Sequence, residues 1–311
     1  MADVREHKEY FINRLKKKKR ELIPWARKHD IEAFRLYDRD LPEVPLTADI
    51  YGSSLLVYDY RKDKGDIGWM EMMKEALRDV TGFSEKDLFV HQRHSRSRGQ
   101  YDTNPADVRE MIIREQGLRF LVRLGCYADS GLFPDHRLTR RLIQKWASHK
   151  DVLNLYAYTG AFSVYAAKGE AASTLSVDLS RTYCRWARKN LELNGIPEVN
   201  HKIENSDVFA FLKNNLSRRW DIIIIDPPTF SVSKKMNYVF DIKRDHVSLI
   251  QMAFPLLKEK GVILFSTNAH KFKMAQETMS EMHVEEITEQ TIPEDYRQHR
   301  PHRCWVIRKA G

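Results

Sequence analysis

From Val152 onward, short apolar runs alternate with longer stretches of helical periodicity, and this alternation limits the possible folds more than any other feature. The apolar runs are VLNLYAYTG, STLSVD, HKIENSD, WDIIIIDPP, GVILFST, HVEEIT and CWVIRKA. Continuous apolar strands separated by helices are typical of a parallel sheet that helices cover on both faces. Ligands of such sheets collect at the carboxyl ends of the strands. We therefore predict an α/β domain with seven strands, whose functional residues follow the strands directly.

The residues before this pattern predict a different, mixed α+β domain. Residues 5–23 have the periodicity of an amphipathic helix, which Pro24 is expected to break or restart. Short β-branched and aromatic runs between residues 34 and 60 predict antiparallel strands, and a helix is expected near residues 70–80. Residues 109–124 alternate around Gln116-Gly117, as in a β-hairpin. In a chain of 311 residues, we predict a smaller domain over residues 1–125 and a second over 126–311.

Basic residues are concentrated in the predicted first domain. The chain has a formal net charge of +9 and an isoelectric point near 9.3, so a nucleic acid partner fits its charge. Six of the seven residues 14–20 are basic, and the loop that follows DLFVHQ carries three arginines and no acid. Each segment is either a solvated surface or a surface for RNA phosphates. The candidates for RNA contact are Lys16, Lys17, Lys18, Lys19, Arg20, Arg93, Arg96 and Arg98.

A third basic cluster, residues 297–303, lies between the last two predicted strands and carries the same two interpretations. The three cysteines, Cys126, Cys184 and Cys304, lie far apart without a CxxC or Cys/His pattern, so we predict neither a disulfide framework nor a metal site. The first residues lack an apolar signal core, and no run approaches the length of a membrane span. We expect a soluble cytoplasmic protein.

The ends of the first three strands of the second domain carry candidate ligand-binding residues. The turn YAYTGAF after the first strand contains one glycine, whereas a dinucleotide site needs a G-x-G-x-x-G turn, so NAD binding is disfavoured. Asp178 ends the second strand, where a carboxylate accepts hydrogen bonds from both ribose hydroxyls. Its alternative role as a helix N-cap is one that Ser180 is placed to take. Asp207 after the third strand either accepts from an adenine amino group or caps the next helix.

The fourth strand ends in Asp226-Pro227-Pro228-Thr229-Phe230. Two prolines fix their φ angles, so the residues that follow are presented on a stiff turn. We predict that Phe230 stacks on a flat base and that Asp226 accepts hydrogen bonds from it, as N1–H and N2–H of guanine would donate. The alternative is an ordinary turn at the end of a strand. Asp226, Pro227, Pro228 and Phe230 are therefore the candidate catalytic residues.

Together these strand ends resemble the class I S-adenosylmethionine-dependent methyltransferases. The segment from Tyr127 to Arg137, YADSGLFPDHR, resembles the lead-in of the RlmK-type 23S ribosomal RNA methyltransferases, which form the carboxyl half of the fused RlmKL enzymes. The likeness continues through SVDLSRTY, IDPPTFS and RDH and covers nearly the whole chain. It implies a seven-stranded Rossmann-like sheet and S-adenosylmethionine as cofactor. The implied cofactor-binding residues are Phe133, Asp135, Arg137, Asn154, Tyr156, Tyr158, Thr159, Gly160, Asp178, Leu179, Ser180, Asp207 and Asp226.

The resemblance also implies a reaction, methylation of guanine N7 in domain V of 23S ribosomal RNA or its large-subunit precursor. N7 carries a free lone pair, so direct displacement needs no general base. Carbon-5 methylation of a pyrimidine needs a cysteine nucleophile, and residues 264–268, LFSTN, offer none. Methylation of the exocyclic N2 amine stays open, as does a non-catalytic RNA-binding or assembly protein. Arg137 is expected to contact either the cofactor carboxylate or RNA.

Overall fold

The computed structural model describes residues 4–61, 67–92, 108–125, 130–232 and 238–310, and it divides the chain into two compact units. Unit 1 comprises Met1–Pro134 together with Glu294–His299, and unit 2 comprises Asp135–Pro293 together with Arg300–Gly311. The chain therefore leaves unit 2 once, contributes a short segment to unit 1, and returns for its last strand. The predicted contact residues Arg93, Arg96 and Arg98, and Cys126, lie outside the described residues.

Unit 1 is an α+β unit, as its sequence predicts. Its helices and strands are α1 (Val4–Lys28), β1 (Ala33–Asp38), β2 (Leu46–Tyr51), β3 (Ser54–Asp59), α2 (Ile67–Thr81), β4 (Leu88–Gln92), β5 (Arg109–Glu115) and β6 (Leu118–Leu124). Strands β1 to β4 form one sheet in sequence order, with β4 parallel to β3 and the other pairs antiparallel. The predicted antiparallel strands between residues 34 and 60 and the helix near 70–80 are confirmed.

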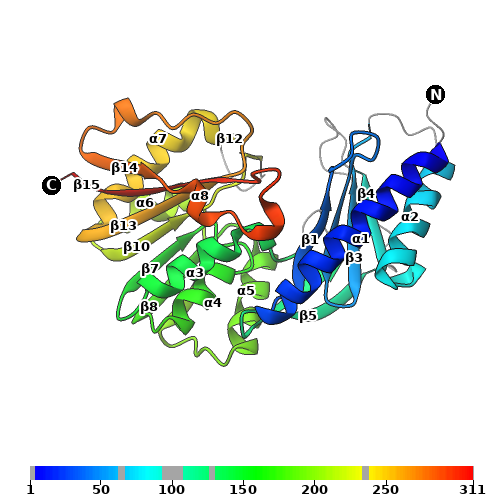
Figure 1. Cartoon of the computed structure of the whole chain (residues 1–311). Coiled ribbons are helices and arrows are strands. Elements are labelled where there is room, and N and C mark those ends of the chain that lie inside the picture. The colour runs from blue at the N-terminus through cyan, green and yellow to red at the C-terminus, as the bar shows by residue number, and fades with distance from the viewer. Residues whose placement is uncertain (1–3, 62–66, 93–107, 126–129, 233–237, 311) are drawn as a thin grey trace. The chain divides into compact units, whose positions relative to one another are not determined.

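Helices α1 and α2 pack side by side against the four-stranded sheet (Figure 1). Phe11 and Leu15 of α1 are fully buried, and Leu22 and Ala26 extend the same apolar face. The prediction that Pro24 ends or restarts this helix is wrong, because α1 continues to Lys28 with Pro24 inside it. Buried residues on both sides of the proline hold the helix together, and this packing outweighs the hydrogen bond that a proline cannot donate.

Strands β5 and β6 form the predicted hairpin. Gln116 and Gly117 connect them with φ angles of 54° and 82°. Positive φ at both central residues is the geometry of a type I′ turn, whose twist matches that of the flanking strands. Asp30 anchors the turn by accepting a hydrogen bond from the Gly117 amide at 2.9 Å.

Unit 2 contains the predicted alternation of strands and helices. Its main elements are α3 (Arg137–Trp146), β7 (Asp151–Leu155), α4 (Ala161–Lys168), β8 (Ser173–Asp178), α5 (Arg181–Leu193), β9 (His201–Asn205), α6 (Val208–Asn214), β10 (Trp220–Ile225), β11 (Phe230–Ser231), β12 (Phe240–Asp241), α7 (Ile242–Ala253), β13 (Leu257–Thr267), β14 (Met282–Glu286), α8 (Thr288–Thr291) and β15 (Arg303–Lys309).

Seven of these strands form one sheet in the order β14-β15-β13-β10-β7-β8-β9. Six of them run in the same direction, and β15 is antiparallel to both of its neighbours, β13 and β14. The expectation of a wholly parallel sheet is therefore wrong at one edge. A buried strand has the same apolar pattern in either direction, and β14 and β15 lack the long helical crossover that a parallel pair requires.

The isoleucine run of β10 lies at the centre of the sheet and is buried on both faces. Ile222 and Ile224 pack with residues of α3 and α4, whereas Ile223 and Ile225 pack with residues of α6 and α7. Successive side chains of a strand point to opposite faces, so four consecutive apolar residues supply both cores. The residue after this strand, Asp226, is thereby fixed at the carboxyl edge.

Cys184 and Cys304 are buried free cysteines, in agreement with their predicted role as small core residues. Burial raises the pKa of the Cys304 thiol, so its reactive thiolate is disfavoured. Within the described part of the chain, no helix combines the length and apolar character needed to cross a membrane.

Candidate active site

The turn between β7 and α4 combines three residues of positive φ, namely Tyr156 at 56°, Tyr158 at 52° and Gly160 at 74°. Such a concentration of left-handed backbone costs free energy and is more common at functional sites than elsewhere. The turn is held against the end of β8, because the Ala157 amide donates to the carbonyl of Val177 at 3.0 Å. Thr159 is buried, and its carbonyl accepts from the side chain of Asn190.

Asp178 lies at the end of β8 with both carboxylate oxygens oriented by backbone amides. Ser180 donates to Oδ1 at 2.8 Å, and Tyr158 donates to Oδ2 at 2.9 Å. A carboxylate has about four lone-pair positions, so two bonds leave capacity for a ligand with two hydroxyl groups. Burial raises the pKa of Asp178, and the two amide bonds act in the opposite direction. The N-cap of α5 is Ser180, which accepts from the Tyr183 amide at 3.3 Å.

The hydroxyl of Tyr156, which follows β7, is a second polar group at the carboxyl edge of the sheet that could form a further hydrogen bond. Its hydroxyl is buried and has no hydrogen-bond partner among the described residues. Burial raises the pKa of this hydroxyl, and the nearby acids Asp207, Asp245 and Asp178 add to the effect. A buried hydroxyl without a partner loses the hydrogen bonds that it makes in water, so a ligand that accepts from it regains free energy.

Both carboxylate oxygens of Asp207 accept hydrogen bonds, one from the backbone of α6 and one from a neighbouring side chain. Its Oδ1 caps α6 by accepting from the Ala210 amide at 2.9 Å, and its Oδ2 accepts from the Tyr238 hydroxyl at 2.7 Å. Helix capping is thus an observed function of this carboxylate. Its predicted contact with an adenine amino group stays a prediction.

Asp226 follows β10, beside the end of β13. The Ser266 hydroxyl donates to its Oδ1 at 2.6 Å, and His136 Nε2 lies 3.6 Å from its Oδ2. Ile225 pairs with Phe265 in the sheet, so the register of two neighbouring strands brings Asp226 and Ser266 together. The carboxylate is half-buried and fixed in orientation, which is what selective acceptance of a base N–H requires.

The turn after Asp226 presents an exposed aromatic ring on a fixed backbone. Pro227 is buried and Pro228 exposed, and the Thr229 hydroxyl donates to Asn268 Oδ1 at 2.7 Å. Phe230 is 52% exposed, while its backbone pairs with that of Asp241 in the β11–β12 ladder. An exposed phenyl ring four residues after an oriented carboxylate offers one group that can stack on a planar base and one that can select among bases.

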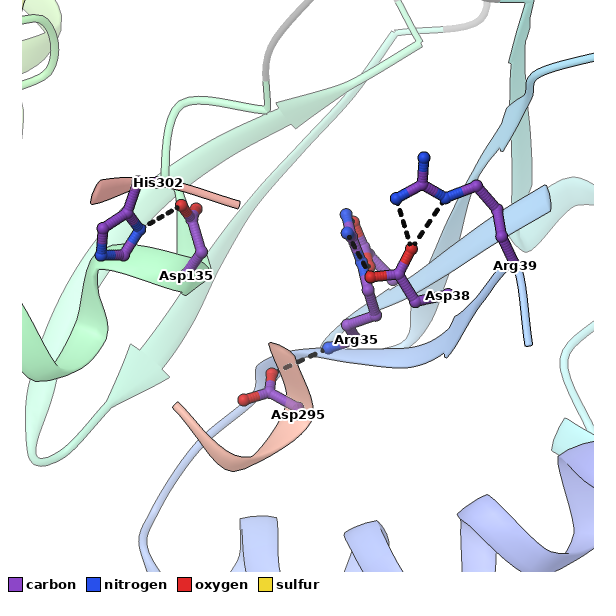
Figure 2. Close-up of polar contacts among 7 residues, drawn as sticks. Arg35, Asp38, Arg39, Asp135, Asp295 and His302 are labelled. Atoms are coloured by element: carbon purple, nitrogen blue, oxygen red, sulfur yellow. Dashed lines mark hydrogen bonds and ion pairs between the residues drawn. The ribbon is translucent and has the colours of Figure 1, made fainter. Parts of the chain in front are cut away.

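Asp135 and His136, the two residues before α3, contact His302, the residue before the last strand. Asp135 Oδ2 accepts from His302 Nδ1 at 3.0 Å (Figure 2). His302 Nε2 lies 3.1 Å from the Thr291 hydroxyl. His136 stacks on His302 with 4.1 Å between the ring centres and 14° between the planes. Burial lowers the pKa of His136, so the neutral ring is favoured.

Asp135, His136 and His302 bring potential metal-ligand atoms within 4.8 Å of one another. Hydrogen bonding accounts for their arrangement, since the two ring nitrogens of His302 face Asp135 and Thr291. Parallel stacked rings direct their lone pairs in separate planes, which does not suit a shared ion. We therefore do not interpret this cluster as a metal centre.

The remaining predicted cofactor residues lie in different surroundings. Asn154 is buried within β7 and donates to Ser163 of α4 at 3.0 Å. Arg137 begins α3 with its side chain buried, and Leu179 is half-buried in the turn after β8. Phe133 is 40% exposed and belongs to unit 1. The geometry leaves their predicted contacts with the cofactor as predictions.

The predicted RNA-contact residues of α1 are not equivalent. Lys16, Lys17 and Arg20 are exposed, whereas Lys18 and Lys19 are half-buried. The Lys19 ammonium donates to the carbonyl of Val80 at 2.6 Å, so it already joins α1 to α2. The sequence reasoning also missed Ser266 and His136 as partners of Asp226, because the pairing of β10 with β13 and the position of α3 leave no local signal.

Comparison with known proteins assigns the family. A profile of the S-adenosylmethionine-dependent methyltransferase family matches residues 41–288. The chain is also 43% identical over 309 residues to "Ribosomal RNA large subunit methyltransferase K" of Neisseria meningitidis, covering 96% of this chain and 86% of that protein. The chain belongs to the S-adenosylmethionine-dependent methyltransferases. This methyltransferase is therefore an enzyme whose cofactor is S-adenosylmethionine, as its sequence predicts.

A second relative shows how this methyltransferase relates to longer proteins. This chain is 42% identical over 314 residues to "Ribosomal RNA large subunit methyltransferase K/L" of Pseudomonas putida, covering 98% of this chain and 43% of that protein. It therefore spans less than half the length of that relative. Among solved structures, it resembles SMU.776, which was crystallised in complex with SAH, with a TM-score of 0.78 and 26% identity over 97% of this chain and 82% of that one. The predicted fold class, a seven-stranded methyltransferase sheet with an amino-terminal α+β part, is confirmed.

Proposed function

We propose that this methyltransferase transfers a methyl group from S-adenosylmethionine to N7 of a guanine in 23S ribosomal RNA. The observation that carries the proposal is the 43% identity to a ribosomal RNA large subunit methyltransferase K over 86% of that protein. The formal net charge of +9 is consistent with an RNA substrate. A ribosomal RNA substrate or precursor would place the enzyme in the cytoplasm.

For the cofactor, we propose a site along the carboxyl ends of β7, β8 and β10. Asp178 would accept from the ribose hydroxyls, because its two amide bonds leave lone pairs unused. The Tyr156 hydroxyl would donate to the ligand, and its lack of a partner among the described residues supports this assignment. Bound S-adenosylmethionine supplies a methyl group that its sulfonium activates for transfer to a nucleophile. The turn and the sheet edge would orient the acceptor and exclude water.

For the base, we propose that Phe230 stacks on the guanine and Asp226 accepts from its N1–H and N2–H groups. The guanine N7 lone pair needs no proton removed, so the role of Asp226 is positioning. Ser266 supports this role by holding one carboxylate oxygen at 2.6 Å. Unpaired or extruded guanine is required, because the major groove of duplex RNA is deep and narrow.

The main alternative is methylation of the exocyclic N2 amine. An acid followed by two prolines and an exposed aromatic ring also suits an amine held by an acceptor, so Asp226 fits this reaction as well. In that case the carboxylate would hold the group that reacts rather than the edge beside it. The assignment of RNA binding to residues 1–125 and catalysis to residues 126–311 belongs to the same proposal.

The experiment that separates the two reactions uses the purified chain, labelled S-adenosylmethionine and an unmodified 23S RNA transcript. N7 methylation gives 7-methylguanosine by mass spectrometry and strand cleavage after borohydride and aniline treatment. N2 methylation gives an isomeric nucleoside and no cleavage, and that result would replace the N7 assignment. Binding of the transcript without any methyl transfer would contradict both reactions on this RNA.

A further inference from the structure

Unit 1 contains a pocket of about 330 Å³ that the reaction chemistry does not use. Its walls come from α1, β1 and the segment Glu294–His299, all of which belong to unit 1. The volume lies within the range of small-molecule and nucleotide sites. Charged residues dominate the lining, with three basic residues and four acidic ones: Lys18, Arg35, Arg297, Asp38, Asp40, Glu294 and Asp295.

Most of these charges are paired within the pocket wall. The Arg35 guanidinium donates to both oxygens of Asp49 at 2.7 and 2.9 Å and to Asp38 at 3.2 Å. Arg39 lies 3.1 Å from the other Asp38 oxygen, and the Arg35 amide donates to Asp295 at 3.0 Å (Figure 2). These side chains comprise three carboxylates and two guanidinium groups, and the bonds among them leave little capacity for a ligand.

Asp40 and Lys18 of this lining have polar groups without a partner among the described residues. The Asp40 side chain is 1% exposed, and Arg14 donates to its Oδ2 at 2.7 Å, but its Oδ1 has no hydrogen-bond partner among the described residues. Lys18 lies one helical turn after Arg14 and is half-buried. Its ammonium has no hydrogen bond or ion pair within the described ranges. A buried carboxylate oxygen without a donor costs free energy, which a donor on a ligand would recover.

We infer that this pocket binds one nucleotide of the substrate RNA, with its phosphate at Lys18 and an amino group of its base at Asp40. The ligand must offer an anion and a hydrogen-bond donor together. A simple anion would leave Asp40 unsatisfied, and a simple cation would leave Lys18 unsatisfied, whereas a nucleotide supplies both groups. Carboxylates read amino groups of bases, and lysine contacts phosphate. This inference rests on the proposed function, because it requires an RNA substrate.

The test compares the full-length Lys18→Gln and Asp40→Asn variants with wild type. The readouts are methyl transfer to the 23S transcript and filter binding of that RNA at several salt concentrations. Lys28→Gln is the matched control, since Lys28 is exposed on the same helix and does not line the pocket. We expect Lys18→Gln to raise KM for RNA about five- to tenfold with kcat unchanged, and to reduce the salt slope of binding by about one.

Asp40→Asn should also raise KM, and its thermal unfolding is measured to show that the variant folds. Lys18→Gln tests the pocket independently, because a half-exposed lysine is not needed for folding. Equal KM and salt slope for Lys18→Gln and Lys28→Gln would overturn the inference. An effect of Asp40→Asn alone, with the variant folded, would indicate a cationic occupant and would also overturn it.

The same measurements test the proposed reaction and the pocket assignment independently of each other. If the wild-type chain binds the transcript without methylating it, while Lys18→Gln still weakens that binding, the pocket stands and the reaction does not. If the wild type methylates the transcript and Lys18→Gln behaves as Lys28→Gln does, the reaction stands and the pocket assignment is wrong.

Discussion

At the scale of single residues, the proposed chemistry depends on polar groups that the fold orients and leaves with unused capacity. Asp178 accepts two backbone amides, and Asp226 accepts the Ser266 hydroxyl, yet each carboxylate has lone pairs left. Tyr158 and Ser266, which fix part of these orientations, come from the ends of neighbouring strands, and Ser180 comes from the turn that follows Asp178. A substitution that keeps the shape and removes the charge therefore tests the function of the carboxylate with little change in packing.

For Asp226→Asn, we expect kcat/KM for methyl transfer to fall about 10- to 100-fold. The physical reason is loss of a hydrogen bond to a charged acceptor, which contributes about 1.5 to 3 kcal/mol. Labelled methyl transfer to the RNA transcript gives the rate, and nucleoside mass analysis gives the product. Glu198→Gln is the control, because its exposed ion pair with Arg188 contributes little. Unchanged turnover and base choice in Asp226→Asn would contradict the assigned role.

His246 gives a residue-scale prediction about pH. The Ala275 amide donates to its Nε2 at 3.2 Å, and its Nδ1 lies 3.0 Å from the Ile242 carbonyl, so Nδ1 carries the proton of a neutral ring. Burial lowers the pKa of His246 below its usual value of 6.5. When the pH falls below 6.5, His246 binds a proton in the unfolded chain but remains neutral in the folded chain. The free energy of unfolding therefore falls as the pH falls.

We therefore expect His246→Asn to reduce the pH dependence of the free energy of unfolding below pH 6.5. Denaturant unfolding between pH 7.5 and 5.5 measures this slope, which is compared even if the variant is less stable throughout. His283→Asn replaces an exposed histidine of β14 and should leave the slope as it is in wild type. A wild-type slope retained in His246→Asn would show that this ring does not titrate as described.

At the scale of elements, close packing of α4 and α5 positions the turn proposed for the cofactor. Gly160 begins α4 with φ of 74°, and a Cβ built there would lie 2.9 Å from the Cβ of Ala187 in α5. Glycine is therefore required twice, for its backbone conformation and for the approach of the helices.

For Gly160→Ala, we expect a loss of about 1 to 3 kcal/mol in the free energy of unfolding, together with weaker S-adenosylmethionine binding. Denaturant unfolding and calorimetry measure the two effects. The double variant Gly160→Ala, Ala187→Gly removes the overlap but keeps the strained φ. Its loss in the free energy of unfolding should be smaller than the sum of the losses of the two single variants. Strict additivity would attribute the whole cost to the backbone and none to the helix contact.

Local pattern predicts element type well and element direction poorly. The alternation after Val152 predicts all seven strands, and Gln116-Gly117 predicts the hairpin turn. The antiparallel direction of β15 is missed because an apolar run reads the same in both directions. Pro24 inside α1 is missed because buried residues on both sides decide the length of that helix. Polar partners such as Ser266 depend on strand pairing, and strand pairing is not a local property.

At the scale of the whole molecule, the chain is built from two units, each of which is made of two separate segments of the chain. Glu294–His299 belongs to unit 1, although it lies between β14 and β15 of unit 2 in the sequence. The Arg35 guanidinium lies over the ring of Tyr296, 4.5 Å from its centre. The Arg35 amide also donates to Asp295. Unit 1 therefore depends for part of its structure on residues that a division near residue 125 would remove.

For Tyr296→Ala, we expect unit 1 to lose about 3 kcal/mol of stability, because Tyr296 is only 2% exposed and removing a buried aromatic ring typically costs 3 to 5 kcal/mol. Hydrogen exchange of the full-length chain locates the effect, with faster exchange expected for the amides of β1 and little change in β7 and β10. Tyr10→Ala is the matched control, since Tyr10 is 54% exposed on α1. If β1 exchanges equally in both variants, Glu294–His299 rests on unit 1 without stabilising it. Faster exchange in β7 and β10 instead would assign Tyr296 to the stability of the methyltransferase sheet.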